Sequence, residues 1–155
     1  MTTNPSAILE VQGPQATLTL NRPEQRNALS TDLLDALHQR LDELEPLMND
    51  AGSRPRVLTI TGAGKAFCAG MDLKQVIIDA DHGGSGDPAL GHRLLSALAR
   101  LTLRLRSLPC VVLAKVNGPA VGGGCGMLCV ADLAVTHAEN KVGFPEVDLG
   151  LCPAV

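Results

Sequence analysis

The chain has 155 residues, 45% of them hydrophobic, and a formal net charge of −3 at pH 7, so we predict one domain over residues 1–155 with a hydrophobic core. Its acidic balance argues against a nucleic-acid partner. Its low aromatic content, two Phe with no Trp or Tyr, leaves no stacking platforms for single-stranded nucleic acid. No apolar run approaches the ~20 residues of a membrane span, and no secretory signal begins the chain, so we expect a cytoplasmic protein without membrane contact.

The first third of the chain predicts a hairpin, a helix and a strand. Apolar residues favour strands at residues 8–11 and 16–20, separated by a Gly13-Pro14 turn. Ser30 is suited to cap the helix that follows. The helix has an apolar stripe at helical spacing, which we assign to the core: Leu33, Leu37, Leu41, Leu44 and Met48. Residues 57–61 form the next predicted strand.

The rest of the chain predicts alternating helices and strands. Residues 80–88 (ADHGGSGDP) read as a polar loop, and residues 90–108 as a long helix whose arginines lie on a solvated face. Residues 111–116 (VVLAKV) form a buried strand, followed by a glycine cluster and a helix at residues 125–131. This order predicts an α/β fold.

The glycine cluster, residues 122–124, is the most informative local feature. Consecutive glycines let the backbone approach a ligand closely, and the first N–H groups of the following helix have no partners within it. An anion or a developing oxyanion can therefore bind there. Close packing of helix and strand through small residues is the alternative interpretation. The loop after residues 57–61 repeats the arrangement, so two N–H groups can point at one carbonyl oxygen.

The cysteines and histidines predict no metal site. The five cysteines include no CxxC pair, so we expect neither a disulfide framework nor zinc and interpret them as small buried hydrophobic residues. The four histidines, which are His38, His82, His92 and His137, are expected on the surface or in structural hydrogen bonds.

Four sequence blocks, in matching order, resemble the crotonase or enoyl-CoA hydratase/isomerase superfamily. They are NRP at 21–23 with NAL at 27–29, KAFCAGMDLK at 65–74, NGPAVGGG at 117–124, and FPE at 144–146 with GL at 150–151. The resemblance implies a crotonase-like spiral of ββα units. Full members of the superfamily are longer, so it also implies an N-terminal core that is truncated and lacks the C-terminal helical region.

The resemblance further implies specific roles for residues. The carbonyl of an acyl-CoA thioester would be held by the backbone N–H groups of Met71 and Gly123, and Glu146 would transfer a proton. Coenzyme A would enter as part of the substrate, with no separate cofactor and no metal. The residues implied to bind coenzyme A are Arg26, Ala28, Lys65, Ala69, Asp72, Leu73 and Lys74. Asp132 matches a frequent Asp of the superfamily and is implied to be structural.

One departure from the superfamily pattern narrows the activity. Common hydratases carry a second Glu two residues after the glycine cluster, where this chain has Gly126. The pattern PEVDLGLCPA at 145–154 resembles bacterial hydratases of branched glutaconyl-CoA esters, so we expect an enoyl-CoA hydratase of that type. A 3,2-enoyl-CoA isomerase that uses a single Glu is one alternative, and an inactive truncated CoA-binding remnant is another. The resemblance implies a homotrimer or hexamer for the full-length protein.

Overall fold

The main sheet of the protein has five strands. The computed structural model describes residues 4–49, 52, 54–72, 88–150 and 152–153. The strands of the sheet are β1 (Ala7–Gln12), β2 (Gln15–Leu20), β3 (Val57–Gly62), β4 (Val111–Val116) and β6 (Leu133–Thr136). They lie in the order β1-β2-β3-β4-β6, and only the β1–β2 pair among them is antiparallel. The α/β fold class predicted from the sequence is confirmed.

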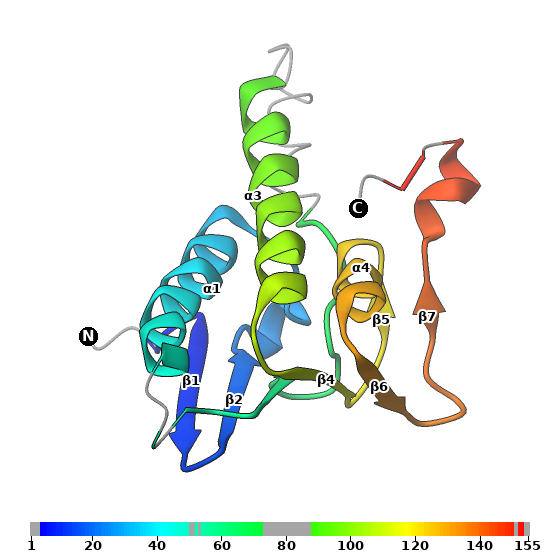
Figure 1. Ribbon diagram of the computed structural model, residues 1–155. Coiled ribbons are helices and arrows are strands. Elements are labelled where there is room, and N and C mark those ends of the chain that lie inside the picture. Colours follow the sequence, from blue (N-terminus) through cyan, green and yellow to red (C-terminus); the bar gives the residue numbers. More distant parts are fainter. Residues whose placement is uncertain (1–3, 50–51, 53, 73–87, 151, 154–155) are drawn as a thin grey trace.

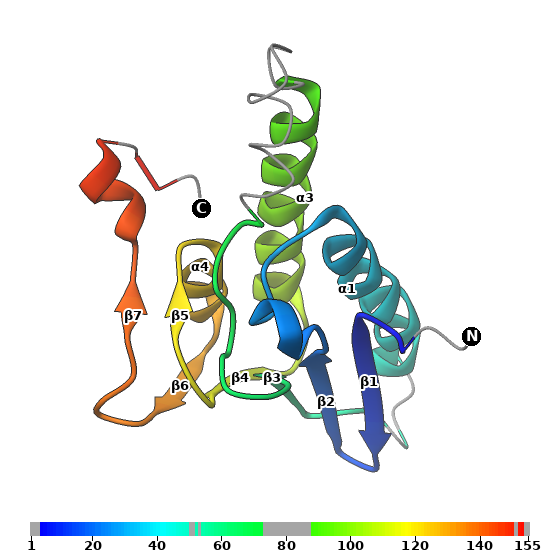
Figure 2. The same cartoon turned by 180° about the vertical axis from the view of Figure 1, so that it is seen from behind.

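Two helices lie on the same side of this sheet, in front of it in Figure 1 and behind it in Figure 2. They are α1 (Thr31–Leu44) and α3 (Pro88–Ser107), and α4 (Gly123–Val130) packs beside α3. Three short 3₁₀ helices complete the helical elements of the described residues: η1 (Pro23–Gln25), η2 (Glu45–Asn49) and η3 (Pro145–Leu149). No helix in these described ranges is long and apolar enough to cross a membrane. Residues 80–87 of the predicted polar loop lie outside the described residues.

Helix α1 forms where its sequence predicts it. The hydroxyl of Ser30 accepts a hydrogen bond from the Leu33 N–H at 3.2 Å, which satisfies one of the unpaired donors of the first turn. The predicted apolar stripe is buried, including Met48 on η2. The stripe faces the inward-pointing residues of the central strands, which alternate with half-buried or exposed ones: Ala16, Leu18, Leu20, Leu58, Ile60, Val112, Ala114 and Val116. The core therefore fills the space between helices and sheet.

Loops at the carboxyl ends of β3 and β4 lead to the candidate site. After β4 the chain forms a two-residue strand, β5 (Ala120–Val121), which pairs in parallel with β7 (Val142–Gly143). Helix α4 then begins at Gly123, two residues earlier than the sequence predicts. Asp132, after α4, has the expected structural role, because its carboxylate accepts a hydrogen bond from the Val112 N–H at 2.8 Å.

Candidate active site

Two glycine-containing segments, residues 68–71 and 120–123, run side by side. Cys68 and Ala120 form a parallel bridge, and the Val121 N–H donates to the Cys68 carbonyl at 3.0 Å. Two residues further on, a Cβ added to Gly70 would lie 3.0 Å from the Val121 carbonyl oxygen, and one added to Gly122 would lie 3.8 Å from the Cα of Gly70. Met71 and Gly123, the next residues of the two segments, therefore follow directly after this contact.

The N–H groups of Met71 and Gly123 have no acceptor among the described residues. The backbone groups on either side of Met71 are hydrogen-bonded, because the Leu29 N–H donates to the Gly70 carbonyl at 2.8 Å and the Asp72 N–H donates to the Leu29 carbonyl at 2.9 Å. Gly123 is the first residue of α4, where a helix provides no carbonyl for its N–H groups. Two unpaired donors thus lie on adjacent segments, one at the positive end of a helix.

Each glycine of the cluster has a steric reason. Gly122 has φ +53° and ψ −124°, a conformation open almost only to glycine. A Cβ on Gly123 would lie 2.7 Å from side-chain carbons of Leu29 and Leu98, and a Cβ on Gly124 would lie 2.7 Å from the Cys68 carbonyl oxygen. The close packing that the sequence offers as one interpretation is therefore present, and the unpaired N–H of Gly123 lies in the same segment.

Glu146 approaches the same place from a third segment. It follows β7 on η3, and β7 is tied to the cluster because the Gly122 N–H donates to the Gly143 carbonyl at 2.9 Å. The carboxylate oxygens of Glu146 lie 3.5 and 3.7 Å from the position of a Cβ on Gly122. Glu146 is half-buried, and its carboxylate has no hydrogen bond or ion pair with any residue that the structure describes. A carboxylate thus lies next to Gly122, the residue that precedes the unpaired N–H of Gly123.

The segment carrying Arg26 and Ala28 borders the site along residues 69–72. The Ala69 N–H donates to the Arg26 carbonyl at 3.0 Å, so the two segments are held in register. Arg26 is exposed and has φ +51°, while Ala28 and Ala69 are half-buried. The carboxylate of Asp72 is paired with Arg22 at 3.4 Å. Leu73 and Lys74, the other predicted coenzyme A contacts on this segment, lie outside the described residues.

Lys65 projects from a fixed turn at the edge of the site. Its side chain is exposed, and two asparagines hold the turn by donating to the Ala66 carbonyl, Asn27 at 2.9 Å and Asn117 at 3.5 Å. A Cβ on Gly118 would lie 2.1 Å from the Lys65 carbonyl oxygen. Both asparagines lie inside the sequence blocks used above, but the sequence analysis assigned neither a hydrogen-bonding role. A polar side chain in a turn, or just after the end of a strand, is the signal that could have identified them.

The cysteines follow the prediction only in part. All five are free. Burial raises the pKa of Cys68 to about 12. Burial also raises the pKa of Cys125 to about 11, with smaller contributions from neighbouring Cys129 and the charge of Glu146. The prediction of burial is wrong for Cys129 and Cys152, which are exposed. No group of side chains in the described ranges could hold a metal ion.

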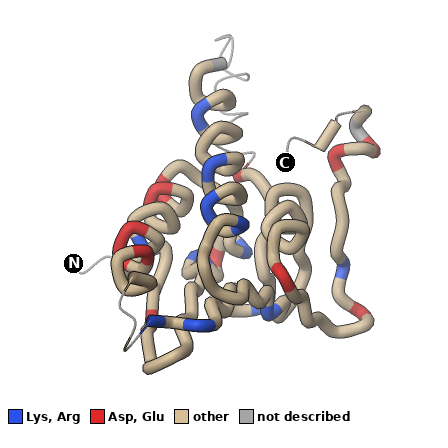
Figure 3. The backbone as a smooth tube through the Cα atoms, viewed as in Figure 1, with Lys and Arg blue, Asp and Glu red and all other residues tan. Residues whose placement is uncertain are grey.

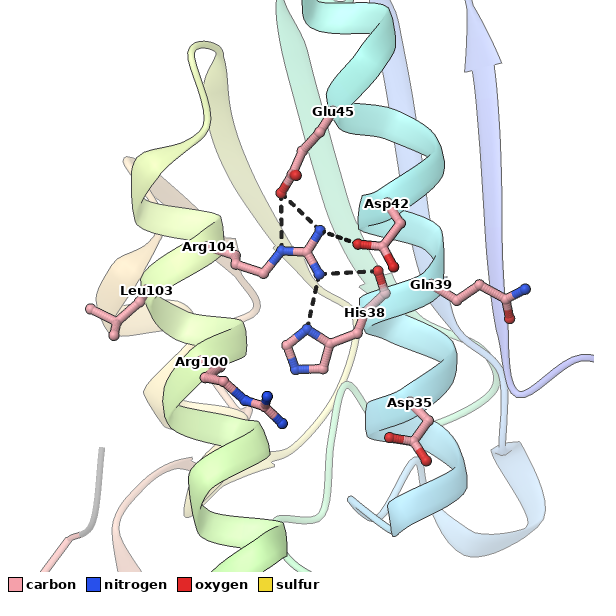
Figure 4. A pocket seen from close by; sticks show the side chains of 8 residues that line it. All are labelled: Asp35, His38, Gln39, Asp42, Glu45, Arg100, Leu103 and Arg104. Carbon is pink, nitrogen blue, oxygen red and sulfur yellow. Dashed lines mark hydrogen bonds and ion pairs between the residues drawn. The ribbon is translucent and has the colours of Figure 1, made fainter.

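A separate polar cluster lies between α1 and α3, beside a cavity of about 630 Å³ (Figure 4). Acidic residues gather on α1 and basic ones on α3, as Figure 3 shows. Arg104 donates to Glu45, to Asp42 and to the Nδ1 of His38. Because arginine has no acceptor, the hydrogen of His38 is on Nε2, which donates to the Ala97 carbonyl at 3.0 Å.

This cluster joins two helices rather than forming the site. His38 has the structural role predicted for it. The prediction that the arginines of the helix at residues 90–108 are solvated is wrong for Arg104, whose side chain is 24% exposed. Burial alone would lower the pKa of Arg104, but its hydrogen bonds to Glu45 and Asp42, together with the charges of these carboxylates, raise it.

Comparisons with known proteins identify the family. The sequence pattern of the family described as enoyl-CoA hydratase/isomerase matches residues 11–155. The chain is 36% identical over 149 residues to an enoyl-CoA hydratase of Mycobacterium tuberculosis, a match that covers 96% of this chain and 53% of that protein. It is 35% identical over 149 residues to a short-chain-enoyl-CoA hydratase of Clostridium acetobutylicum, covering 96% of this chain and 52% of the relative.

The structural comparison agrees. A crystal structure of an enoyl-CoA hydratase/isomerase from Marinobacter aquaeolei superimposes with a TM-score of 0.78 and 36% sequence identity, covering 96% of this chain and 55% of the other. The chain spans about half the length of the curated relatives it matches. The crotonase-like fold predicted from the sequence is thereby confirmed. The chain belongs to the enoyl-CoA hydratase/isomerase family.

Proposed function

We propose that the protein acts on an acyl-CoA thioester as an enoyl-CoA hydratase, with the reaction centred on Met71, Gly123 and Glu146. The observation that supports this most is the convergence of two unpaired backbone N–H groups and one unpaired carboxylate on the segment around Gly122. The N–H groups suit a developing enolate oxygen. A carboxylate beside them suits proton transfer at the neighbouring carbons.

The chemistry needs only these groups and water. Glu146 takes a proton from water as the water oxygen bonds to the β-carbon of the enoyl thioester. The electron pair of the double bond moves toward the thioester carbonyl, whose oxygen becomes an enolate held by the Met71 and Gly123 N–H groups. Glu146 then returns the proton to the α-carbon. Each preorganised donor of this kind contributes about 3–4 kcal/mol to the stabilisation of the transition state.

Coenzyme A would lie along the edge formed by Arg26, Ala28, Lys65, Ala69 and Asp72, continuing toward Leu73 and Lys74. Exposed Arg26 and Lys65 are placed to meet phosphates. Backbone hydrogen bonds hold residues 26–29 beside residues 69–72, which supports the proposal that both segments contact the coenzyme A part of the substrate. Coenzyme A is thus part of the substrate, and no other cofactor is invoked. For the whole protein we propose a homotrimer or a hexamer.

The acyl group is the finer part of the proposal. Gly126 is buried in α4 and supplies no second carboxylate, and the PEVDLGLCPA segment resembles hydratases of branched glutaconyl-CoA esters. We therefore propose a branched glutaconyl-CoA ester as substrate. A single carboxylate also suits a 3,2-enoyl-CoA isomerase, in which Glu146 would carry a proton from one carbon to another. An inactive CoA-binding remnant is the third possibility.

Product masses separate these activities. The chain is incubated with 3-methylglutaconyl-CoA, crotonyl-CoA and a 3-enoyl-CoA, and the products are followed by mass spectrometry. A gain of one water, fastest with 3-methylglutaconyl-CoA, is the expected result. Migration of the double bond at unchanged mass would replace the hydratase by the isomerase. Binding of the thioesters without turnover would leave the remnant as the better description.

A further inference from the structure

We propose that Arg22 is a positioning residue that fixes the Met71 N–H through Asp72. The inference rests on the proposed function of that N–H group. Sequence analysis gave Arg22 no role, although it lies in the NRP block at residues 21–23. In the structure, its guanidinium contacts both the segment that contains Met71 and the neighbouring segment that pairs with it.

Met71 is held by its neighbours rather than by its own hydrogen bonds. Leu29 and Met71 form an isolated parallel bridge. The hydrogen bonds of this bridge, from Leu29 N–H to Gly70 at 2.8 Å and from Asp72 N–H to Leu29 at 2.9 Å, lie on either side of Met71. The direction of the Met71 N–H therefore depends on the register of these two short segments.

The Arg22 side chain stabilises this register by bonding to both segments. The Nη1 atom of Arg22 donates to the Ala28 carbonyl at 2.7 Å and to Asp72 Oδ2 at 3.4 Å. Ala28 precedes Leu29 and Asp72 follows Met71, so one nitrogen ties together both sides of the bridge. The side chains of Arg22 and Asp72 are only 19% and 13% exposed, which limits competition from water.

The base of the Arg22 side chain is itself fixed. The Arg22 N–H donates to the Oδ1 of Asn27 at 2.8 Å, and Asn27 is fully buried. The Nδ2 of Asn27 donates to the Ala63 and Ala66 carbonyls at 3.0 and 2.9 Å. Arg22 therefore connects Asp72, through Asn27, to the turn that follows β3. This connection fixes the position of Asp72 and, with it, the direction of the Met71 N–H.

The test removes the guanidinium and measures both the bridge and the reaction. In Arg22→Gln, hydrogen exchange of the Leu29 and Asp72 N–H groups is expected to rise at least tenfold. A donor displaced by about 1 Å can cost up to about a hundredfold in rate, so we expect kcat to fall tenfold to a hundredfold while KM changes less than threefold. Arg22→Lys, which keeps the charge, is expected to recover part of the rate.

The matched control is Arg106→Gln. Arg106 pairs with Asp132 at 3.3 Å, nearly the distance of the Arg22–Asp72 pair, but it lies on α3 and touches none of these segments. It should leave the exchange of Leu29 and Asp72 and the rate unchanged. If Arg22→Gln does not fold, Asp72→Asn removes the same ion pair. Because Asp72 also lies on the proposed coenzyme A edge, exchange of the Leu29 N–H, and not KM, decides the outcome for that variant.

The outcomes separate this inference from the proposed function. Unchanged exchange at Leu29 and Asp72 would overturn the positioning role, and so would faster exchange with an unchanged kcat in an active protein. If the unaltered chain turns over no acyl-CoA, the proposed function fails. The exchange measurement then still decides whether Arg22 holds the Met71 segment.

Discussion

Replacing Gly122 by alanine should damage the candidate site through the backbone rather than through a clash. An alanine Cβ would lie 3.5 Å from Glu146 Oε2 and 3.8 Å from the Gly70 Cα, which are ordinary contact distances. The φ of +53° and ψ of −124°, however, belong to a region essentially reserved for glycine. Holding alanine there costs about 1–3 kcal/mol, and relief of that strain would rotate the first turn of α4 and the Gly123 N–H with it.

The expected losses of stability and of rate in Gly122→Ala can both be measured. For a domain of this length, about 1–3 kcal/mol corresponds to a fall in Tm of about 2–12 °C. Thermal unfolding followed by circular dichroism gives this shift, and turnover of an enoyl-CoA at a temperature where the variant is folded gives the loss of rate, expected to be tenfold or more.

Gly13→Ala is the matched control. Gly13 also has a positive φ, +57°, but it lies in the β1–β2 turn with nothing within 4 Å of an added Cβ. We expect a comparable cost of about 1–2 kcal/mol with an unchanged rate. The reasoning would be refuted if Gly122→Ala lost neither stability nor rate, or if Gly13→Ala lost as much rate as Gly122→Ala.

Three further predictions concern the surrounding fold. Ser30→Ala should lower the free energy of unfolding by about 1 kcal/mol in urea, because the cap of α1 is lost; no change would mean that the cap is not formed in solution. Arg104→Gln should cost more stability than Arg40→Gln, since Arg104 bonds across two helices whereas Arg40 pairs with Glu43 within one, and equal losses would contradict this. Burial raises the pKa of Cys68 from its ordinary 9.0 to about 12. The unfolded chain therefore loses this proton first, and stability should fall between pH 9 and 12, at up to about 1.4 kcal/mol per pH unit, a slope that should shrink in Cys68→Ala.

The regular elements were predictable because their signals are local. Ser30 and the leucine stripe of α1 lie within one helix, so capping and periodicity suffice. The start of α4 was placed two residues late because glycines carry little helical signal. Gly123 and Gly124 are in the helix because it packs against Leu98 and Cys68, and that closeness is a tertiary fact.

The site shows the same division between local and tertiary information. Met71, Gly123 and Glu146 were proposed from sequence blocks, and the structure brings their segments together at Gly122. Whether they act as proposed remains a prediction. The Arg22–Asp72 pair joins residues 50 positions apart, and no local pattern indicates such a partner. For the same reason the contacts of Arg104 with His38 and Glu45 were missed, and a two-residue pairing such as β5 with β7 is too short to have a period.

Steady-state hydration of an enoyl-CoA by the unaltered chain, Glu146→Gln and Asp148→Asn tests the central claim most directly. Glutamine keeps the size of Glu146 but cannot accept the proton, so we predict at least a hundredfold loss of kcat. Asp148→Asn makes the equivalent change on the exposed side of η3, two residues away, and should leave kcat within twofold. Equal rates for Glu146→Gln and the unaltered chain would contradict the account.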